Sequence, residues 1–303
     1  MPLSQQTLVQ RLAALRPGRP HRVLADRPDA TVVAAGGVVA KAHDPGSDPA
    51  ALRARLRLAA HPALSGVLLA PLPGPPHVWD DRLVTQWPEG APVSPDHPED
   101  APWAQAGRLL ARLHRLDPAA LPGPLPPMRG PAKAARALAR LHAAPAPKGP
   151  DAAAPVRRAW AQLPPWARGE EPYAGPTALC HGDLHLGQLV RHPLPDGPWL
   201  LIDIDDTGLG DPAWDLARPA ACYATGLVPP ADWEALLSAY REAGGTAAGP
   251  PGAGLWPARL EVPARALTVQ MAALALARAR EEGRAPDDVD RDLLKACERM
   301  VYP

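Results

Sequence analysis

The chain has 303 residues, 46% of them hydrophobic, and its 32 Lys and Arg balance its 32 Asp and Glu. This balance leaves no net basic field for nucleic acid or an anionic membrane, so we expect neither as a partner. The chain has the size of a globular enzyme, with no signal pattern and no apolar run of about 18 residues, which favours a cytoplasmic protein. Its three Cys are widely spaced, so we expect reduced thiols and no zinc site.

The amino-terminal part predicts a small antiparallel sheet with two helices. Apolar residues at near-helical spacing predict a helix over 3–16, and short apolar runs separated by turn residues predict strands. The predicted strands are 21–25, 31–35, 38–42, 66–70 and 82–87, with Gly36-Gly37 as a hairpin turn and a second helix over 50–60. Because Pro88-Glu89-Gly90 breaks the pattern, we place a boundary there between an amino-terminal lobe, 1–87, and a carboxyl-terminal lobe.

The second predicted lobe, residues 88–303, is mainly helical. Leu109, Leu110, Leu113 and Leu116 recur at three- and four-residue steps, so a helix over 103–116 is expected. Further predicted elements are helices over 132–143, 156–163, 214–224, 231–243, 263–282 and 287–300, and a strand over 199–204 after a turn near Pro195-Asp196-Gly197.

The densest chemistry lies in His181-Gly182-Asp183-Leu184-His185-Leu186-Gly187-Gln188 and in the apolar run that ends at Asp203. The Asp183 carboxylate can accept a hydroxyl proton, and Gln188 and Asp203 offer the hard oxygen ligands that Mg²⁺ requires. The spacing of Asp183 and Gln188 equals that of the base and the metal-binding amide in kinase catalytic loops. These residues therefore predict phosphate transfer.

The same residues resemble the H-G-D-x-H-x-x-N loop of the aminoglycoside phosphotransferase and choline kinase-like superfamily. The continuation from Asp203 to Leu216 is similar to that superfamily's I-D-[WF]-x-x-x-x-x-G-D-P-x-x-D-L-A motif. The resemblance implies a bilobal α+β protein-kinase-like fold and an enzyme that uses ATP and Mg²⁺ to phosphorylate a hydroxyl of a small molecule. It implies that residues 1–87 are the nucleotide-binding lobe and that residues 88–303 are the helical lobe with the catalytic loop and the acceptor site. It also implies that Asp183 is the catalytic base, that His185 lies near the transferring phosphate and that Gln188 and Asp203 hold the metal.

Position 188 carries Gln where this superfamily usually has Asn. The form HGDLHLGQ resembles the loop of maltokinase-type sugar kinases, which favours a sugar hydroxyl. Asp211, directly before Pro212, is expected to cap the following helix, and Asp215 in its first turn suits the helix dipole.

The amino-terminal lobe offers nucleotide-binding residues by the same resemblance. Val38-Val39-Ala40-Lys41 is similar to the strand whose Lys neutralises the α- and β-phosphates, and the backbone of Gln86 and Trp87 is similar to an adenine-binding hinge. The family's Glu partner of this Lys is missing, because the first Glu of the chain is Glu89. Either Asp44 or Asp48 orients Lys41, or the phosphates do so alone, or nucleotide binding is weak.

Three other functions fit parts of the pattern. The missing Glu and the Gln at 188 motivate a catalytically weak or inactive kinase-like nucleotide-binding protein. The run from Asp203 to Thr207 is similar to the D-x-D-x-T loop of haloacid dehalogenase-type phosphatases, in which Asp203 would be the nucleophile. A metal-dependent hydrolase using His181, Asp183 and His185 is the third.

The acceptor stays open at this point among an aminoglycoside or other antibiotic, a sugar or amino sugar, and a small metabolic alcohol. Four acidic residues either attract a cationic acceptor or are simply solvated: Asp205, Asp206, Glu234 and Glu261. Their places in the structure therefore bear on the charge of the acceptor. A monomer or a homodimer is expected.

Overall fold

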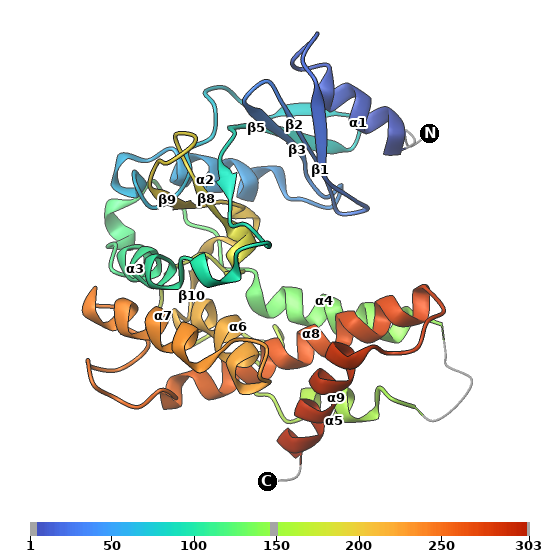
Figure 1. Ribbon diagram of the computed structural model, residues 1–303, viewed down its shortest axis with the longest axis vertical. Coiled ribbons are helices and arrows are strands. Elements are labelled where there is room, and N and C mark those ends of the chain that lie inside the picture. The colour runs from blue at the N-terminus through green and yellow to red at the C-terminus, as the bar shows by residue number, and fades with distance from the viewer. Residues whose placement is uncertain (1–4, 146–150, 302–303) are drawn as a thin grey trace. The chain divides into compact units, whose positions relative to one another are not determined.

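The computed structural model describes residues 5–145 and 151–301 (Figure 1). The helices are α1 (Gln5–Ala13), α2 (Pro49–Ala59), α3 (Trp103–His114), α4 (Gly130–Ala143), α5 (Ala154–Ala161), α6 (Ala213–Ala224), α7 (Pro230–Glu242), α8 (Glu261–Glu281) and α9 (Asp288–Val301). The strands are β1 (His21–Arg27), β2 (Ala30–Ala35), β3 (Val38–Ala42), β4 (His77–Trp79), β5 (Arg82–Pro88), β6 (Ala91–Pro92), β7 (Ala178–Cys180), β8 (Leu189–Arg191), β9 (Trp199–Leu201) and β10 (Gly208–Gly210). Each predicted helix is present, except that residues 3 and 4 of the first lie outside the described residues.

Two compact units make up the chain, and they are interleaved in sequence. The first contains residues up to 101 together with 117–126 and 187–205, and the second contains 102–116, 127–186 and the residues from 206 onwards. These bounds differ from a single break after residue 87, because the segment with β8 and β9 packs with the amino-terminal sheet region.

The main sheet of the first unit is antiparallel, with strand order β1-β2-β3-β5-β4. Gly36 and Gly37 have φ of 56° and 79° in the turn between β2 and β3, which confirms the predicted hairpin. Helix α1 covers one face of the sheet through Leu8 and Leu12, which pack with Val33, Ala40 and Val84 of the strands. Because side chains alternate along a strand, Lys41 of β3 lies on the other face.

A second sheet in this unit has the order β6-β8-β9. The predicted strand over 66–70 is wrong as a full strand: only Leu68 forms a single parallel bridge, to Leu201, because its partner β9 ends at that residue. The predicted strand over 199–204 ends at Leu201, where the backbone begins to turn. The three-residue strand β4 was too short to predict from alternation.

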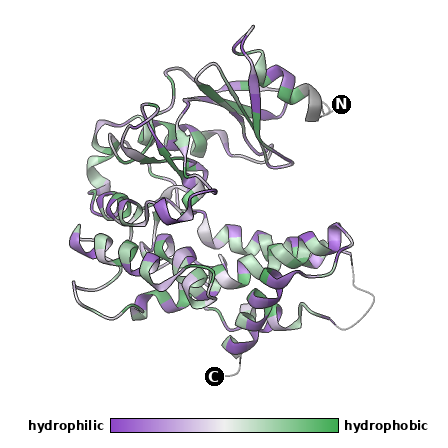
Figure 2. Cartoon of the chain, viewed as in Figure 1, coloured by the Kyte–Doolittle hydropathy of each residue, from purple (hydrophilic) through white to green (hydrophobic). Residues whose placement is uncertain are grey.

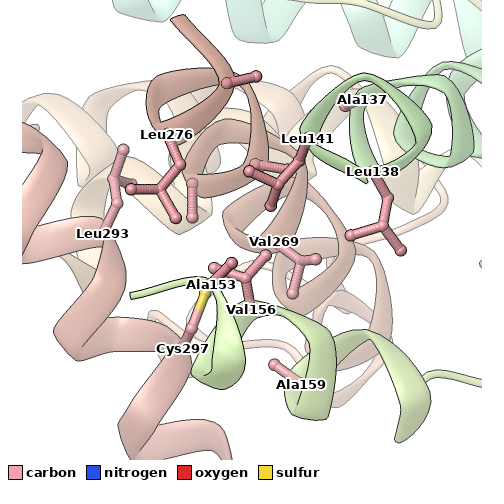
Figure 3. Packing of buried hydrophobic residues seen from close by; sticks show 13 residues of the cluster. Ala137, Leu138, Leu141, Ala153, Val156, Ala159, Val269, Leu276, Leu293 and Cys297 are labelled. Atoms are coloured by element: carbon pink, nitrogen blue, oxygen red, sulfur yellow. The ribbon is translucent and has the colours of Figure 1, made fainter. Parts of the chain in front are cut away.

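Helix α8 is central to the second unit and contacts α4, α6 and α9. In Figure 3, side chains from α4, α5, α8 and α9 converge on a buried cluster that includes Leu141, Val156, Val269 and Leu293. Although the helix over 258–281 is long and apolar enough to cross a membrane, 67% of its apolar window is buried inside the protein. Figure 2 shows green and purple residues mixed along α9, as expected of a helix with one solvent-facing side. Because most of its apolar window is buried, we interpret α8 as the core helix of this unit.

Strands β7 and β10 form a two-stranded antiparallel sheet in the second unit, with Leu179 opposite Leu209. The loop that begins at His181 follows β7 directly, and Asp206 and Thr207 directly precede β10. Antiparallel pairing therefore brings these two polar segments to the same end of the small sheet.

Candidate active site

The loop after β7 is held in place by Asp215, in the first turn of α6. The backbone N–H groups of His181 and Gly182 each donate to the Asp215 carboxylate at 2.6 Å. Gly182 has φ of 88°, and a Cβ at this position would lie 2.4 Å from the backbone oxygen of Asp206. Any larger residue would displace the loop, so both Gly182 and Asp215 position Asp183.

Asp215 also belongs to a buried hydrogen-bond chain. His114 of α3 lies between the Asp215 carboxylate, 2.9 Å from Nε2, and the Tyr240 hydroxyl, 2.8 Å from Nδ1. Burial alone would raise the pKa of Asp215, but its hydrogen bond with His114 and the charges nearby lower it overall. Cys180 lies close enough to complete a three-ligand metal set, yet burial raises the pKa of its thiol well above the ordinary value. We therefore interpret this network as an anchor for the catalytic loop.

Asp211 also contacts the start of α6, as the sequence predicted. Its Oδ1 accepts from the Ala213 N–H at 3.1 Å, although the helix begins at Ala213, one residue later than the Pro212 start implied. Arg259 binds the same carboxylate at 2.9 Å. Both Asp211 and Asp215 thus have structural roles at the first turn of the helix.

Both carboxylate oxygens of Asp183 are bound by cations. Lys133 of α4 approaches Oδ2 at 2.5 Å, and Arg218 of α6 approaches Oδ1 at 2.8 Å. Lys133 also binds Asp206 at 2.7 Å, and Arg129 lies 3.8 Å from that second carboxylate. Burial disfavours the charge on Lys133, but Asp206 and Asp183 outweigh it and raise the Lys133 pKa. Within the second unit, three cations therefore surround two carboxylates.

His185 follows Asp183 by two residues and is neutral at physiological pH. Burial and, to a smaller extent, the nearby positive charge of Arg218 lower the pKa of His185 to about 4, while Asp183 opposes the shift. A neutral imidazole can donate one hydrogen bond and accept another, but it adds no charge to the cluster. The sequence prediction that His185 lies near the transferring phosphate stays a prediction.

Lys41 obtains its carboxylate partners from the segment after β9. Its Nζ lies 2.7 Å from Asp203 and 2.9 Å from Asp205. Asp44 and Asp48, the partners considered from sequence, instead accept backbone N–H groups of Gly46 and Ala50. Although burial opposes the charge on Lys41, the two carboxylates raise its pKa overall. Asp203 and Asp205 are therefore the carboxylate partners of Lys41 in this structure.

A buried chain of polar groups holds Asp205 in turn. His43, two residues after Lys41 and on the same face, contacts Asp205 through Nδ1 at 3.1 Å and the Thr85 hydroxyl through Nε2 at 2.8 Å. The Trp87 indole donates to the same hydroxyl at 2.9 Å. Burial would raise the pKa of Asp205, but Lys41 and His43 hold it well below the ordinary value, so Asp205 stays ionised.

Gln188 and Asp203 are brought together by the β8–β9 hairpin. Leu189 pairs with Leu201, and the Ile202 N–H donates to the Gln188 carbonyl at 2.9 Å, which closes the end of the ladder. The Gln188 Nε2 then donates to Oδ2 of Asp203 at 3.4 Å, and the amide oxygen would face the same place if the amide turned by about 180° on metal binding. Asp203 has φ of 64°, a left-handed conformation that Asp tolerates and that is common at functional sites. The carboxylate and amide oxygens fit Mg²⁺, since both are hard ligands and the group has excess negative charge.

The backbone groups expected to bind adenine are partly engaged already. The Gln86 carbonyl accepts the Leu72 N–H at 2.9 Å, and β5 pairs with β3 with Trp87 opposite Val39. Gln86 also lines a cavity of about 210 Å³ with Leu56 and the 71–77 segment. The adenine-binding role of Gln86 and Trp87 stays a prediction.

Sequence reasoning missed Lys133, Arg218 and His43, yet one signal was available. Only four of the chain's 32 basic Lys and Arg residues are Lys, and two of these four, Lys41 and Lys133, each bridge two aspartates. A compact ammonium with three rotatable donors can bind two separate carboxylates, whereas the planar guanidinium of Arg favours one bidentate partner. The scarcity of Lys in this Arg-rich chain was therefore the signal that could have drawn attention to Lys133.

The phosphatase alternative conflicts with the structure. A doubly wound sheet would place the Asp203 segment on a central parallel strand. Over the described ranges, however, every ladder between named strands is antiparallel, and Asp203 follows the short edge strand β9.

Comparisons with known structures agree with a protein-kinase-like α+β fold. A choline/ethanolamine kinase family protein from Mesorhizobium loti aligns with a TM-score of 0.55 and 21% identity, covering 98% of this chain and 100% of that chain. Aminoglycoside phosphotransferase APH(3'')-Id from Streptomyces rimosus aligns with a TM-score of 0.57 and 22% identity, covering 88% and 97%. An amicoumacin kinase in complex with AMP-PNP, Ca²⁺ and Ami aligns with a TM-score of 0.66 and 14% identity, covering 99% and 93%.

A search of curated proteins found no match. The model of the phosphotransferase enzyme family matches residues 12–256, which include Lys41, the loop with Asp183, and Asp203. This match spans most of the chain, and it includes each residue whose geometry is described above for phosphate chemistry. The chain therefore belongs to the phosphotransferase enzyme family.

Proposed function

We propose that the protein transfers the γ-phosphate of ATP to a hydroxyl of a small molecule. The observation that carries the proposal is Lys41 bound to Asp203 and Asp205 beside Gln188, because this set joins a phosphate-binding cation to a pair of metal ligands. The Asp183 loop supplies a carboxylate five residues before Gln188, the spacing that phosphotransfer loops use. The complex of the amicoumacin kinase with AMP-PNP and Ca²⁺ supports nucleotide and divalent-metal use.

In the first unit, Lys41 would bind the α- and β-phosphates while Asp205 and His43 keep its ammonium in position. Asp203 and Gln188 would hold Mg²⁺, which when bound neutralises charge on the phosphates. Lys41 can release Asp203 to the metal without losing its counterion, since Asp205 stays beside it. Two aspartates on one lysine thus suit a site that must exchange a partner when Mg-nucleotide arrives.

In the second unit, Asp183 would orient the acceptor hydroxyl and accept its proton as the new O–P bond forms. Phosphoryl transfer proceeds through a loose transition state, so alignment of the hydroxyl matters more than a strong base. The cations on both oxygens of Asp183 are compatible with this role because a carboxylate has about four acceptor sites. Asp215 and Gly182 would maintain the orientation through the loop backbone.

The test combines nucleotide binding with turnover. Calorimetric titration with Mg-AMP-PNP should show binding that Asp203→Asn weakens, and ADP release over an acceptor panel should show turnover that Asp183→Asn reduces by about 10²- to 10⁴-fold. Asp292→Asn, an exposed aspartate on α9, is the matched control and should change neither. Nucleotide binding without turnover on any acceptor would favour the inactive, nucleotide-binding alternative. Absence of nucleotide binding would refute the proposal.

Small-molecule phosphorylation by ATP suits the cytoplasm, where ATP is abundant, and we expect the protein there. Antibiotic, sugar and metabolic alcohol acceptors all fit a kinase of this family. The choice between them depends on the charge that surrounds Asp183.

A further inference from the structure

The acidic residues that suggested a cationic acceptor are not arranged to bind one. Asp205 binds Lys41 and His43, and Asp206 binds Lys133. Glu234 is exposed on α7, and Glu261 accepts the Trp256 indole N–H at 2.9 Å at the start of α8. Over the described part of the second unit, the charged groups that contact Asp183 are Lys133 and Arg218, both positive.

The charge balance around Asp183 is positive. Lys133, Arg129 and Arg218 contribute three positive charges against the two carboxylates of Asp183 and Asp206, and His185 adds none near neutral pH. A cationic acceptor would bring a fourth positive charge into this partly buried cluster. An anionic group would instead complete its neutralisation.

One N–H donor of Arg218 has no hydrogen-bond partner among the described residues. Its Nη2 binds Asp183, but its buried Nε has no hydrogen-bond partner among the described residues. A buried, unsatisfied guanidinium N–H is costly, so Arg218 would gain by turning to present Nε together with an Nη, the fork that binds a carboxylate or phosphate with two parallel hydrogen bonds. This second observation is independent of the charge count, and it also favours an anionic ligand.

We propose that the acceptor is an alcohol that carries a carboxylate or phosphate group, and that Arg218 and Lys133 recognise that group. The inference rests on the proposed function and gives the substrate class of the same site. Binding of the anion draws one cation away from Asp183 and so frees a carboxylate oxygen for the hydroxyl. The acceptor's own charge therefore exposes the base that orients it.

The transfer step itself conserves atoms and charge. The acceptor oxygen forms a bond to the γ-phosphorus of ATP, the bond from that phosphorus to the bridging oxygen breaks, and ADP leaves. The hydroxyl proton passes to Asp183 and then to solvent. Neither Lys133 nor Arg218 loses a proton in this sequence, so both keep their charge for the anionic group throughout.

Matched alcohols that differ in charge test the proposal. We would measure kcat/KM for phosphorylation of glycerate against glycerol and of gluconate against glucitol, with glucosamine as the cationic member. The carboxylates should be preferred by about 10- to 100-fold, as expected for hydrogen bonds to charged groups. Arg218→Gln and Lys133→Gln should abolish that preference, whereas Arg136→Gln, an exposed arginine on the same helix as Lys133, should keep it.

Binding provides a readout that does not depend on turnover. Calorimetric titration with gluconate and with glucitol should show tighter gluconate binding that both glutamine variants remove while their KM for ATP is unchanged. Equal binding, a preference for glucosamine, or a carboxylate preference that survives in both variants would overturn the inference. A raised KM for ATP alone would also overturn it, because the cations would then serve the nucleotide. Failure of Mg-AMP-PNP to bind would instead refute the proposed function, independently of these titrations.

Discussion

Lys41 in the first unit and Lys133 in the second each bridge two aspartates, yet the two clusters differ in net charge. Lys41 faces Asp203 and Asp205, so negative charge exceeds positive. Lys133 faces Asp183 and Asp206, but Arg129 and Arg218 reverse the balance. The first cluster is therefore suited to a divalent cation, and the second to an anion.

The comparison shows that the same arrangement, a lysine between two aspartates, can belong to sites of opposite net charge. In each cluster the carboxylates satisfy a lysine that would otherwise be costly to bury, and they hold it in position before any ligand is present. The neighbouring residues then decide which ligand fits. In the first unit the neighbour of Asp203 is the Gln188 amide, and in the second the neighbour of Asp183 is the Arg218 guanidinium.

The largest expected effect concerns the stability of the two clusters. Lys41→Met should lower the free energy of unfolding by about 3–5 kcal/mol, because it leaves two partly buried aspartates without their cation. Lys133→Met should cost only about 1–3 kcal/mol, since Arg129 and Arg218 still contact the same carboxylates. Urea unfolding of both full-length variants measures the difference. Equal losses would contradict the distinction between the clusters.

A pH effect should appear in the second unit through His185. Its pKa is lowered from about 6.5 in the unfolded chain to about 4 in the fold, first by burial and then by Arg218. The unfolded chain therefore binds a proton that the folded chain excludes, and stability should be fully present above pH 6.5 and fall by about 2–3 kcal/mol as the pH is lowered to 4. His185→Gln should remove this part of the loss in urea unfolding at several pH values. His97→Gln, an exposed histidine, serves as the control.

Separate substitution of the two aspartates in the first cluster should distinguish metal binding from positioning of Lys41. Asp203→Asn should raise the Mg²⁺ concentration needed for half-maximal nucleotide binding by about 10- to 100-fold, as expected for loss of a metal-site carboxylate. Asp205→Asn should leave the Mg²⁺ requirement nearly unchanged and weaken nucleotide binding instead, because it removes the counterion of Lys41. Calorimetry at varied Mg²⁺ measures both quantities. The roles assigned here would be exchanged if Asp205→Asn had the larger effect on Mg²⁺.

The smallest expected effect concerns Gln270 of α8. Both amide atoms of this buried side chain lack a hydrogen-bond partner among the described residues, and α8 packs against the helices that carry Lys133 and Arg218. Gln270→Met should raise the free energy of unfolding by about 1–2 kcal/mol, because it removes the unsatisfied polar group at similar volume. Unfolding in urea measures this change. A loss of stability would contradict this expectation. It would indicate that the Gln270 amide has a hydrogen-bond partner, and that polar contacts of the second cluster reach α8.

Most of the elements were predictable because helix and strand periodicity is local. The apolar steps of α3 and the Gly36-Gly37 turn between β2 and β3 are examples in which a few neighbouring residues determine the outcome. The segment 66–70 was not predictable as a single bridge, since its pairing with Leu201 depends on a strand far along the chain. The interleaving of the two units could not be predicted either, because it depends on contacts between segments far apart in the sequence.

The sequence by itself determined the phosphate chemistry, because Asp183, Gln188 and Asp203 lie within one short motif and Lys41 in a recognisable strand. Only the tertiary structure decided which cation binds which carboxylate. Lys41 contacts an aspartate 162 residues away, and Lys133 one that is 50 residues away, and no local pattern specifies such pairs. The sign of the charge around Asp183 follows from those long-range pairings, and it distinguishes an anionic acceptor from a cationic one.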